Sequence, residues 1–107
     1  MRIVLPAHLQ FALANRLLAY CSVLGLALDD QQKPNLRLSF TLEQGNAAKP
    51  LKPLQLQAGA GYGVGDLLAL AVLDLKGIKP GAYRLRVTAE DERQHAQVSE
   101  SVPLDLR

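Results

Sequence analysis

The segment 73–87 constrains the fold of this chain more than any other. An apolar stretch leads into a Lys-Pro-Gly turn, and Tyr83 then opens a run in which apolar and polar residues alternate. A period of two is typical of a strand that buries one face. A tyrosine placed after such a turn can fold back and donate a hydrogen bond to an upstream backbone group, which forms a corner between two strands. We therefore predict an all-β fold in which Tyr83, Pro80 and Gly81 have structural roles.

Strand-like segments recur along the whole chain, separated by turn residues. The clearest is 36–43, where apolar and polar residues alternate without a break. Counting two short N-terminal pieces as one, the pattern predicts about seven strands, at 2–5 with 10–13, 16–26, 36–43, 54–57, 66–75, 83–88 and 98–106. Residues 1–13 and 66–75 also fit a helix by composition. Strands at this spacing predict a β-sandwich, and 107 residues fit a single domain spanning 1–107.

The hydrophobic core is expected to draw one residue face from each strand. Segment 16–26 is almost continuously apolar, as expected of a strand covered on both faces. Residues 44–53 are expected to form a loop, since they carry glycine, asparagine and two prolines. The predicted core residues are Leu18, Tyr20, Leu38, Phe40, Leu70, Val72, Tyr83, Leu85 and Val87.

Charge and cysteine content exclude several classes of function. The net charge of +2 is too small to indicate a nucleic-acid or membrane-surface binder. Arg84 and Arg86 share one strand face, which is either a small basic patch or the solvated side of a sheet. Cys21 is the single cysteine, so neither an internal disulfide nor a cysteine metal cluster can form. Its apolar surroundings indicate a small buried hydrophobic residue.

The glycine-rich stretch 58–65 has two readings. It does not match the dinucleotide-binding pattern Gly-x-Gly-x-x-Gly, because the last position of that pattern is not glycine in any register. It does not match the phosphate-binding loop either, because that loop needs a glycine followed by a lysine, and no glycine of this chain precedes a lysine. It is either a flexible connection between strands or a ligand or partner loop formed by Gly61, Tyr62 and Gly63.

Residues 54–57 form a candidate contact of another kind. Leu54 and Leu56 alternate with glutamines, and Pro53 at the start of the segment suits a strand at a sheet edge. An open edge can receive a strand from a partner protein, which makes Leu54 and Leu56 candidate contact residues.

No catalytic or metal-binding constellation emerges from the sequence. The acidic groups 29–30 and 90–92 lack the alternating spacing of a calcium loop, so we expect solvated turn charges there. His8 and His95 have no second ligand at metal spacing, and no serine lies in a nucleophile elbow. We expect no cofactor, no metal and no enzymatic activity.

The N-terminus has no secretion signal that we can identify. Polar residues interrupt its apolar run, and Tyr20 occupies a position where a lipoprotein cleavage site needs a small residue. Apolar run 17–28 is also shorter than the about 20 residues that a membrane-spanning helix needs. Whether Met1 is the native start stays open, and the chain can be a piece of a longer protein.

Two segments resemble a known group of domains. They are 16–40, with Val-Leu-Gly-Leu at 23–26, and 75–90, with the pattern Leu-x-Gly-Ile-x-Pro-Gly-x-Tyr-x-Leu-x-Val. Together they resemble the immunoglobulin-like or fibronectin III-like domains that follow von Willebrand factor type A-related or GWxTD-motif domains in bacterial envelope and secreted proteins. The resemblance implies an extracytoplasmic accessory module without catalytic residues.

We therefore expect a structural or protein-interaction module of a larger protein. Its partner is a protein of unknown identity or a second copy of the chain. The alternative is a small-ligand or carbohydrate-binding sandwich, although aromatic residues, which usually form sugar platforms, make up only 5% of the chain.

Overall fold

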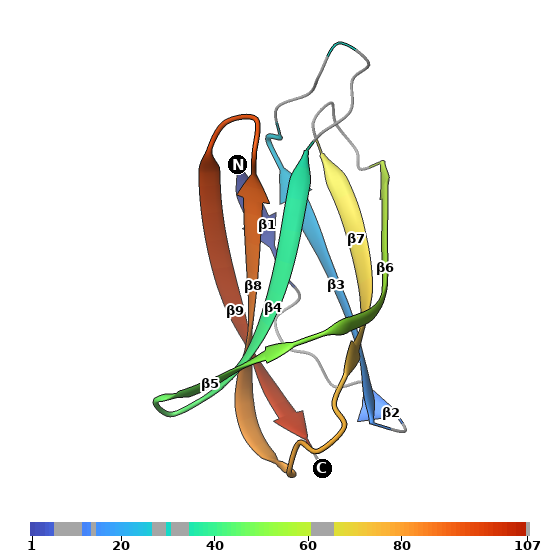
Figure 1. Cartoon of the computed structure of the whole chain (residues 1–107), viewed down its shortest axis with the longest axis vertical. Coiled ribbons are helices and arrows are strands. Elements are labelled where there is room, and N and C mark those ends of the chain that lie inside the picture. The colour runs from blue at the N-terminus through green and yellow to red at the C-terminus, as the bar shows by residue number, and fades with distance from the viewer. Residues whose placement is uncertain (6–11, 14, 27–29, 31–34, 61–65, 107) are drawn as a thin grey trace.

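The computed structural model describes residues 1–5, 12–13, 15–26, 30, 35–60 and 66–106. These residues form a sandwich of two antiparallel β-sheets (Figure 1). The strands are β1 (Arg2–Val4), β2 (Ala12–Leu13), β3 (Arg16–Leu24), β4 (Leu36–Gln44), β5 (Ala47–Leu51), β6 (Pro53–Ala60), β7 (Leu67–Asp74), β8 (Gly81–Asp91) and β9 (Ala96–Leu106). The all-β sandwich predicted from the sequence is confirmed.

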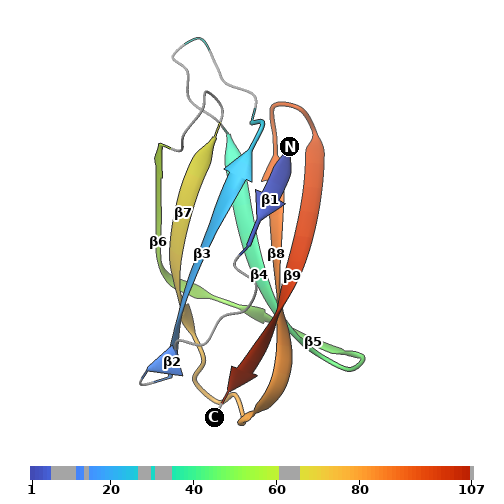
Figure 2. The same ribbon diagram turned by 180° about the vertical axis from the view of Figure 1, so that it is seen from behind.

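The first sheet, here sheet A, has the strand order β1-β3-β7-β6, and β2 pairs with the start of β3. The second, sheet B, has the order β5-β4-β8-β9. Figure 2 shows sheet A from the side opposite to Figure 1. The chain leaves sheet B at the end of β5 and enters sheet A at β6, with Lys52 alone between the two strands.

The core lies between the inner faces of the two sheets. Sheet B contributes large residues to it, including Phe40, Leu85 and Val87, as the alternating patterns of β4 and β8 predict. Leu38 and Tyr83 are half-buried and pack against the same core. Sheet A contributes the paired leucines Leu17 and Leu73 at one end of β3 and β7 and mainly smaller side chains beyond them; these are Ala19, Cys21, Val23, Ala69 and Ala71.

Four of the predicted core residues point away from the core. Leu18, Tyr20 and Leu70 are exposed, and Val72 is only half-buried, because the alternate residues of β3 and β7 point into the core. Both faces of these strands are apolar, so the period-two pattern carries no information about which face is buried. The expectation that both faces of segment 16–26 are covered is also wrong, since only the inner face is covered within the described chain.

The predicted loop 44–53 is wrong as well. After a turn at Gly45, residues Ala47–Leu51 form β5 and pair with β4. This strand lies at the edge of sheet B, where Pro50 can be accommodated without interrupting a central ladder.

Candidate interaction surface

The corner between β7 and β8 is fixed by Tyr83. Its hydroxyl donates a 2.7 Å hydrogen bond to the carbonyl oxygen of Lys79, four residues upstream. This is the contact that the Lys-Pro-Gly-x-Tyr order predicts. Gly81 adopts a φ of +156°, and a Cβ there would lie 3.2 Å from Nε2 of Gln44 and 3.6 Å from the ring of Tyr83. The absence of a side chain at Gly81 therefore leaves room for the Gln44 carboxamide, whose Nε2 donates to the Ala82 carbonyl oxygen at 3.2 Å.

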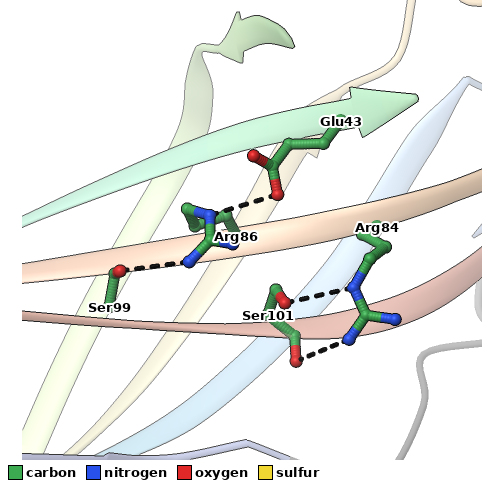
Figure 3. Close-up of polar contacts among 5 residues, drawn as sticks. All are labelled: Glu43, Arg84, Arg86, Ser99 and Ser101. Carbon is green, nitrogen blue, oxygen red and sulfur yellow. Dashed lines mark hydrogen bonds and ion pairs between the residues drawn. The ribbon is translucent and has the colours of Figure 1, made fainter. Parts of the chain in front are cut away.

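The outer face of sheet B is polar and internally bonded (Figure 3). Nε of Arg86 donates to Glu43 Oε1 at 3.1 Å, and Nη1 donates to the Ser99 hydroxyl at 3.2 Å. Arg84 donates through Nε to the Ser101 hydroxyl at 3.1 Å and through Nη2 to the Ser101 carbonyl oxygen at 3.4 Å. The two arginines are thus engaged across neighbouring strands, which is the arrangement of a solvated sheet face. We call this set the arginine ladder.

The outer face of sheet A has the opposite character. Register pairs place Tyr20 beside Leu70, Leu18 beside Val72, and Ser22 beside Leu68. Val4 of β1 lies beside Ser22 and extends the same surface. The large side chains of this apolar face are 38% to 52% exposed; they are Val4, Leu18, Tyr20, Leu68 and Leu70.

The charges of the sheet A outer face lie toward its ends. Arg16 and Asp74 are register partners at one end, and Arg2 lies beside Leu24 at the other. The middle of the surface therefore combines one tyrosine with aliphatic side chains. Contiguous apolar surface of this kind makes the outer face of sheet A a candidate contact site.

Strand β6 ends sheet A and has an open side. Among the described strands it pairs with β7 alone. Leu54 and Leu56 are 49% and 46% exposed, so the structure presents both predicted contact residues at a sheet edge. Leu56 lies beside Ala71 and points to the inner side of sheet A, but sheet B does not cover it. The predicted loop residues Gly61, Tyr62 and Gly63 lie outside the described residues.

The acidic turn between β8 and β9 differs from its prediction. Asp91 is fully buried. Its carboxylate accepts hydrogen bonds from the backbone amides of Arg93 and Gln94 at 3.1 and 3.4 Å, which compensate for the loss of water. Its second oxygen accepts from Gln94 Nε2 at 2.6 Å. Asp91 is therefore a turn-stabilising residue rather than a solvated charge. His95 is exposed in the same turn with φ +52°. Among the described residues, no three His, Cys, Asp or Glu side chains form a group suited to a metal ion.

Cys21 lies inside the sandwich and is 5% exposed. Burial disfavours the thiolate and raises the pKa of this thiol to about 11. Beside it, an apolar void of about 10 Å³ between the sheets is lined by residues such as Ala19, Ala69 and Phe40. A void of that size holds one water molecule at most, so the core contains no ligand site there.

A larger groove lies beside the tyrosine corner. Its volume is about 400 Å³, and its walls come from the β4–β5 hairpin and the turn before β8. Lys49, Lys79 and the ring of Tyr83 contribute to it.

Comparison with known proteins gives no relative: no protein family, no curated protein and no solved structure matches this chain. In the part of the chain that the structure describes, no helix has the length and apolar character needed to cross a membrane.

The sequence reasoning missed the apolar face, although its signal was present. Segments 16–26 and 66–75 are apolar at nearly every position, more than one buried face requires. The excess was assigned to the core. In the structure several large side chains of the two segments lie outside instead; they are Leu18, Tyr20, Leu68 and Leu70.

Proposed function

We propose that this chain is a non-catalytic interaction module that binds a protein partner through the outer apolar face of sheet A. The observation that carries the proposal is the distribution of side-chain size in the middle of β3 and β7. Small residues such as Ala19 and Ala71 point inward, whereas Leu18, Tyr20 and Leu70 point outward. Strands apolar on both faces are typical of sheets covered on both sides. Sheet B covers the inner face of sheet A, and we infer that another molecule or another part of a larger protein covers the outer face.

The difference between the two outer faces supports the same conclusion. In the arginine ladder of sheet B, Arg86 pairs with the Glu43 carboxylate and Arg84 donates to Ser101, so both arginines are engaged within the sheet. The outer face of sheet A carries large apolar side chains with an aromatic residue near its middle. Tyrosine is enriched at protein interfaces, because one ring buries a large area at little entropic cost.

The strand order supports a finer assignment to an immunoglobulin-like or fibronectin III-like sandwich. The order β1-β3-β7-β6 corresponds to strands A, B, E and D of immunoglobulin domains, and β4-β8-β9 corresponds to C, F and G. The Tyr83 hydrogen bond adds the expected corner. The sequence resemblance of 16–40 and 75–90 extends the proposal to an extracytoplasmic module of a larger bacterial envelope or secreted protein.

The test is a binding experiment that compares changes on the outer face of sheet A with changes on the outer face of sheet B. Immobilised wild type is compared with a Leu18→Ser/Leu70→Ser variant and with an Arg84→Ser/Arg86→Ser control, after circular dichroism establishes that all three are folded. Retention of a protein by wild type and the arginine control, but not by the leucine variant, is the expected result. Equal retention by all three proteins, or loss only in the arginine control, contradicts the proposal.

A second candidate is small-ligand binding in the groove beside Tyr83, which its volume favours. The groove lies within the 300–1,000 Å³ range of ligand pockets at about 400 Å³. Gln44, Lys49 and Lys79 supply polar atoms to its walls. A glycan-array signal abolished by Lys79→Ala supports this candidate, and an unchanged signal excludes the groove as its source.

A further inference from the structure

The edges of the two sheets differ in how well they are protected against pairing. Natural sheets blunt their edges with charged residues, prolines and short strands. Strand β1 is three residues long and includes Arg2, β5 contains Lys49 and Pro50, and β9 contains Glu100 and Pro103. In contrast, residues 54–60 of β6 contain no charged residue and no proline.

Protection of β6 is confined to its start. Pro53 begins the strand, and the register with β7 shifts between Pro53 and Gln55. From Gln55 to Ala60 the pairing with β7 is regular, running from Val72 to Leu67. The open side of this part of β6 thus follows a regular strand, which is the geometry that accepts another strand.

We propose that this edge binds a second copy of the chain, with the two β6 strands pairing antiparallel about a two-fold axis. An interface of this kind brings a surface against itself, so the surface must be self-complementary. The neutrality of 54–60 satisfies that condition, because no like charges come together in the pair. The same contact at β5 would bring together the lysines of two copies.

The side chains also match in a pair centred on Gln57. Leu56 then lies opposite Ala58 of the second copy, so a large exposed residue meets a small one. Gln55 lies opposite Gly59, where a Cβ would meet nothing within 4 Å, so a long side chain has room there. Gln57 lies opposite its own copy, and two carboxamides can hydrogen-bond to each other because each has donors and an acceptor.

The pairing has a consequence for the apolar face. In an antiparallel pair, residues directly opposite each other point to the same side of the sheet. The outer faces of the two sheets A therefore lie on the same side and join into one larger surface. This consequence rests on the proposed function, whereas the pairing of the β6 edges does not.

Sedimentation velocity over a range of concentrations tests the pairing with charge variants at the axis. We expect wild type to form a dimer of twice 11.6 kDa. We expect Gln57→Lys and Gln57→Glu to be monomeric when alone and to form a mixed dimer when combined, since opposite charges then meet. Gln97→Lys, an exposed change on edge strand β9, is the matched control and is expected to dimerise as wild type does.

A wild type that stays monomeric overturns the proposal, as does dimerisation of Gln57→Lys alone or failure of the mixed variants to associate. A Leu18→Ser/Tyr20→Ser variant separates this proposal from the proposed function, because both changes lie on β3, which β7 separates from β6. We expect it to dimerise while losing the protein partner. Loss of dimerisation in this variant places the self-contact on the apolar face and contradicts pairing at β6.

Discussion

Tyr20 and Leu70 lie directly opposite each other on β3 and β7, and both side chains point away from the core, 48% and 38% exposed. Their chain neighbours Ala19 and Ala71 form the matching pair on the inner face and are buried. In the middle of β3 and β7 the sheet thus places larger side chains outside and alanines inside. The functional proposal depends on this arrangement.

Truncation of neighbouring leucines on β3 tests the orientation of the strand. Leu17 is fully buried, so we expect Leu17→Ala to lower the free energy of unfolding by about 2–5 kcal/mol. Leu18 is 42% exposed, so Leu18→Ala should cost less than about 1 kcal/mol, because little packing is lost. Urea unfolding of the two variants measures both values. A larger loss for Leu18→Ala than for Leu17→Ala means that the opposite face of β3 is buried.

The corner hydrogen bond of Tyr83 is expected to contribute to stability. Tyr83→Phe removes the 2.7 Å bond to the Lys79 carbonyl and keeps the ring, so we expect a loss of about 1 kcal/mol. Tyr20→Phe is the matched control, because among the described residues the Tyr20 hydroxyl has no hydrogen-bond partner. Its urea midpoint should remain that of wild type. An unchanged midpoint for Tyr83→Phe contradicts a structural role for the corner.

The buried carboxylate of Asp91 is expected to stabilise the β8–β9 turn. Asp91→Ala leaves the amides of Arg93 and Gln94 without their acceptor, which should cost about 1–3 kcal/mol. Its exposed neighbour Glu92 only forms a surface ion pair with Arg37, so Glu92→Ala should cost at most about 1 kcal/mol. Thermal unfolding distinguishes the two. Equal effects at the two positions mean that the turn does not depend on the Asp91 carboxylate.

Burial of the Cys21 thiol gives stability a dependence on alkaline pH. The pKa of this thiol is about 11 in the folded chain, above its ordinary value of 9.0, so the unfolded chain loses its thiol proton first. Stabilisation is therefore complete below pH 9 and is lost as the pH rises from 9 toward 11. Urea midpoints across this range should fall more steeply for wild type than for Cys21→Ala. Identical slopes mean that the thiol ionises equally well in the folded chain.

The sequence could predict the strands in which polar and apolar residues alternate regularly. In β4 and β8 polar residues occupy every second position, so the buried face of Phe40 and Leu85 follows directly from the pattern. In β3 and β7 both faces are apolar, and side-chain size suggests the wrong one. Strand β5 was missed because Lys49 and Pro50 disfavour strands in general, although an edge position tolerates them.

The candidate site was predictable only in part. Alternation and Pro53 indicated that Leu54 and Leu56 belong to an edge strand, and β6 ends sheet A. The apolar face could not be predicted, because which side of β3 faces sheet B depends on packing between segments distant in sequence. The role of Asp91 was missed although its partners are close in sequence, since they are the backbone amides of Arg93 and Gln94 in the same turn.

Photo-cross-linking in cells that express the chain tests the central claim most directly. A benzoylphenylalanine probe replaces Tyr20 in the middle of the apolar face, and a matched probe replaces Ser39, which is exposed on the outer face of sheet B. We predict that light produces a discrete protein adduct from the Tyr20 position and none from Ser39. An adduct from Ser39 alone, or none from Tyr20 while the domain is folded, contradicts the assignment of the apolar face as the contact surface.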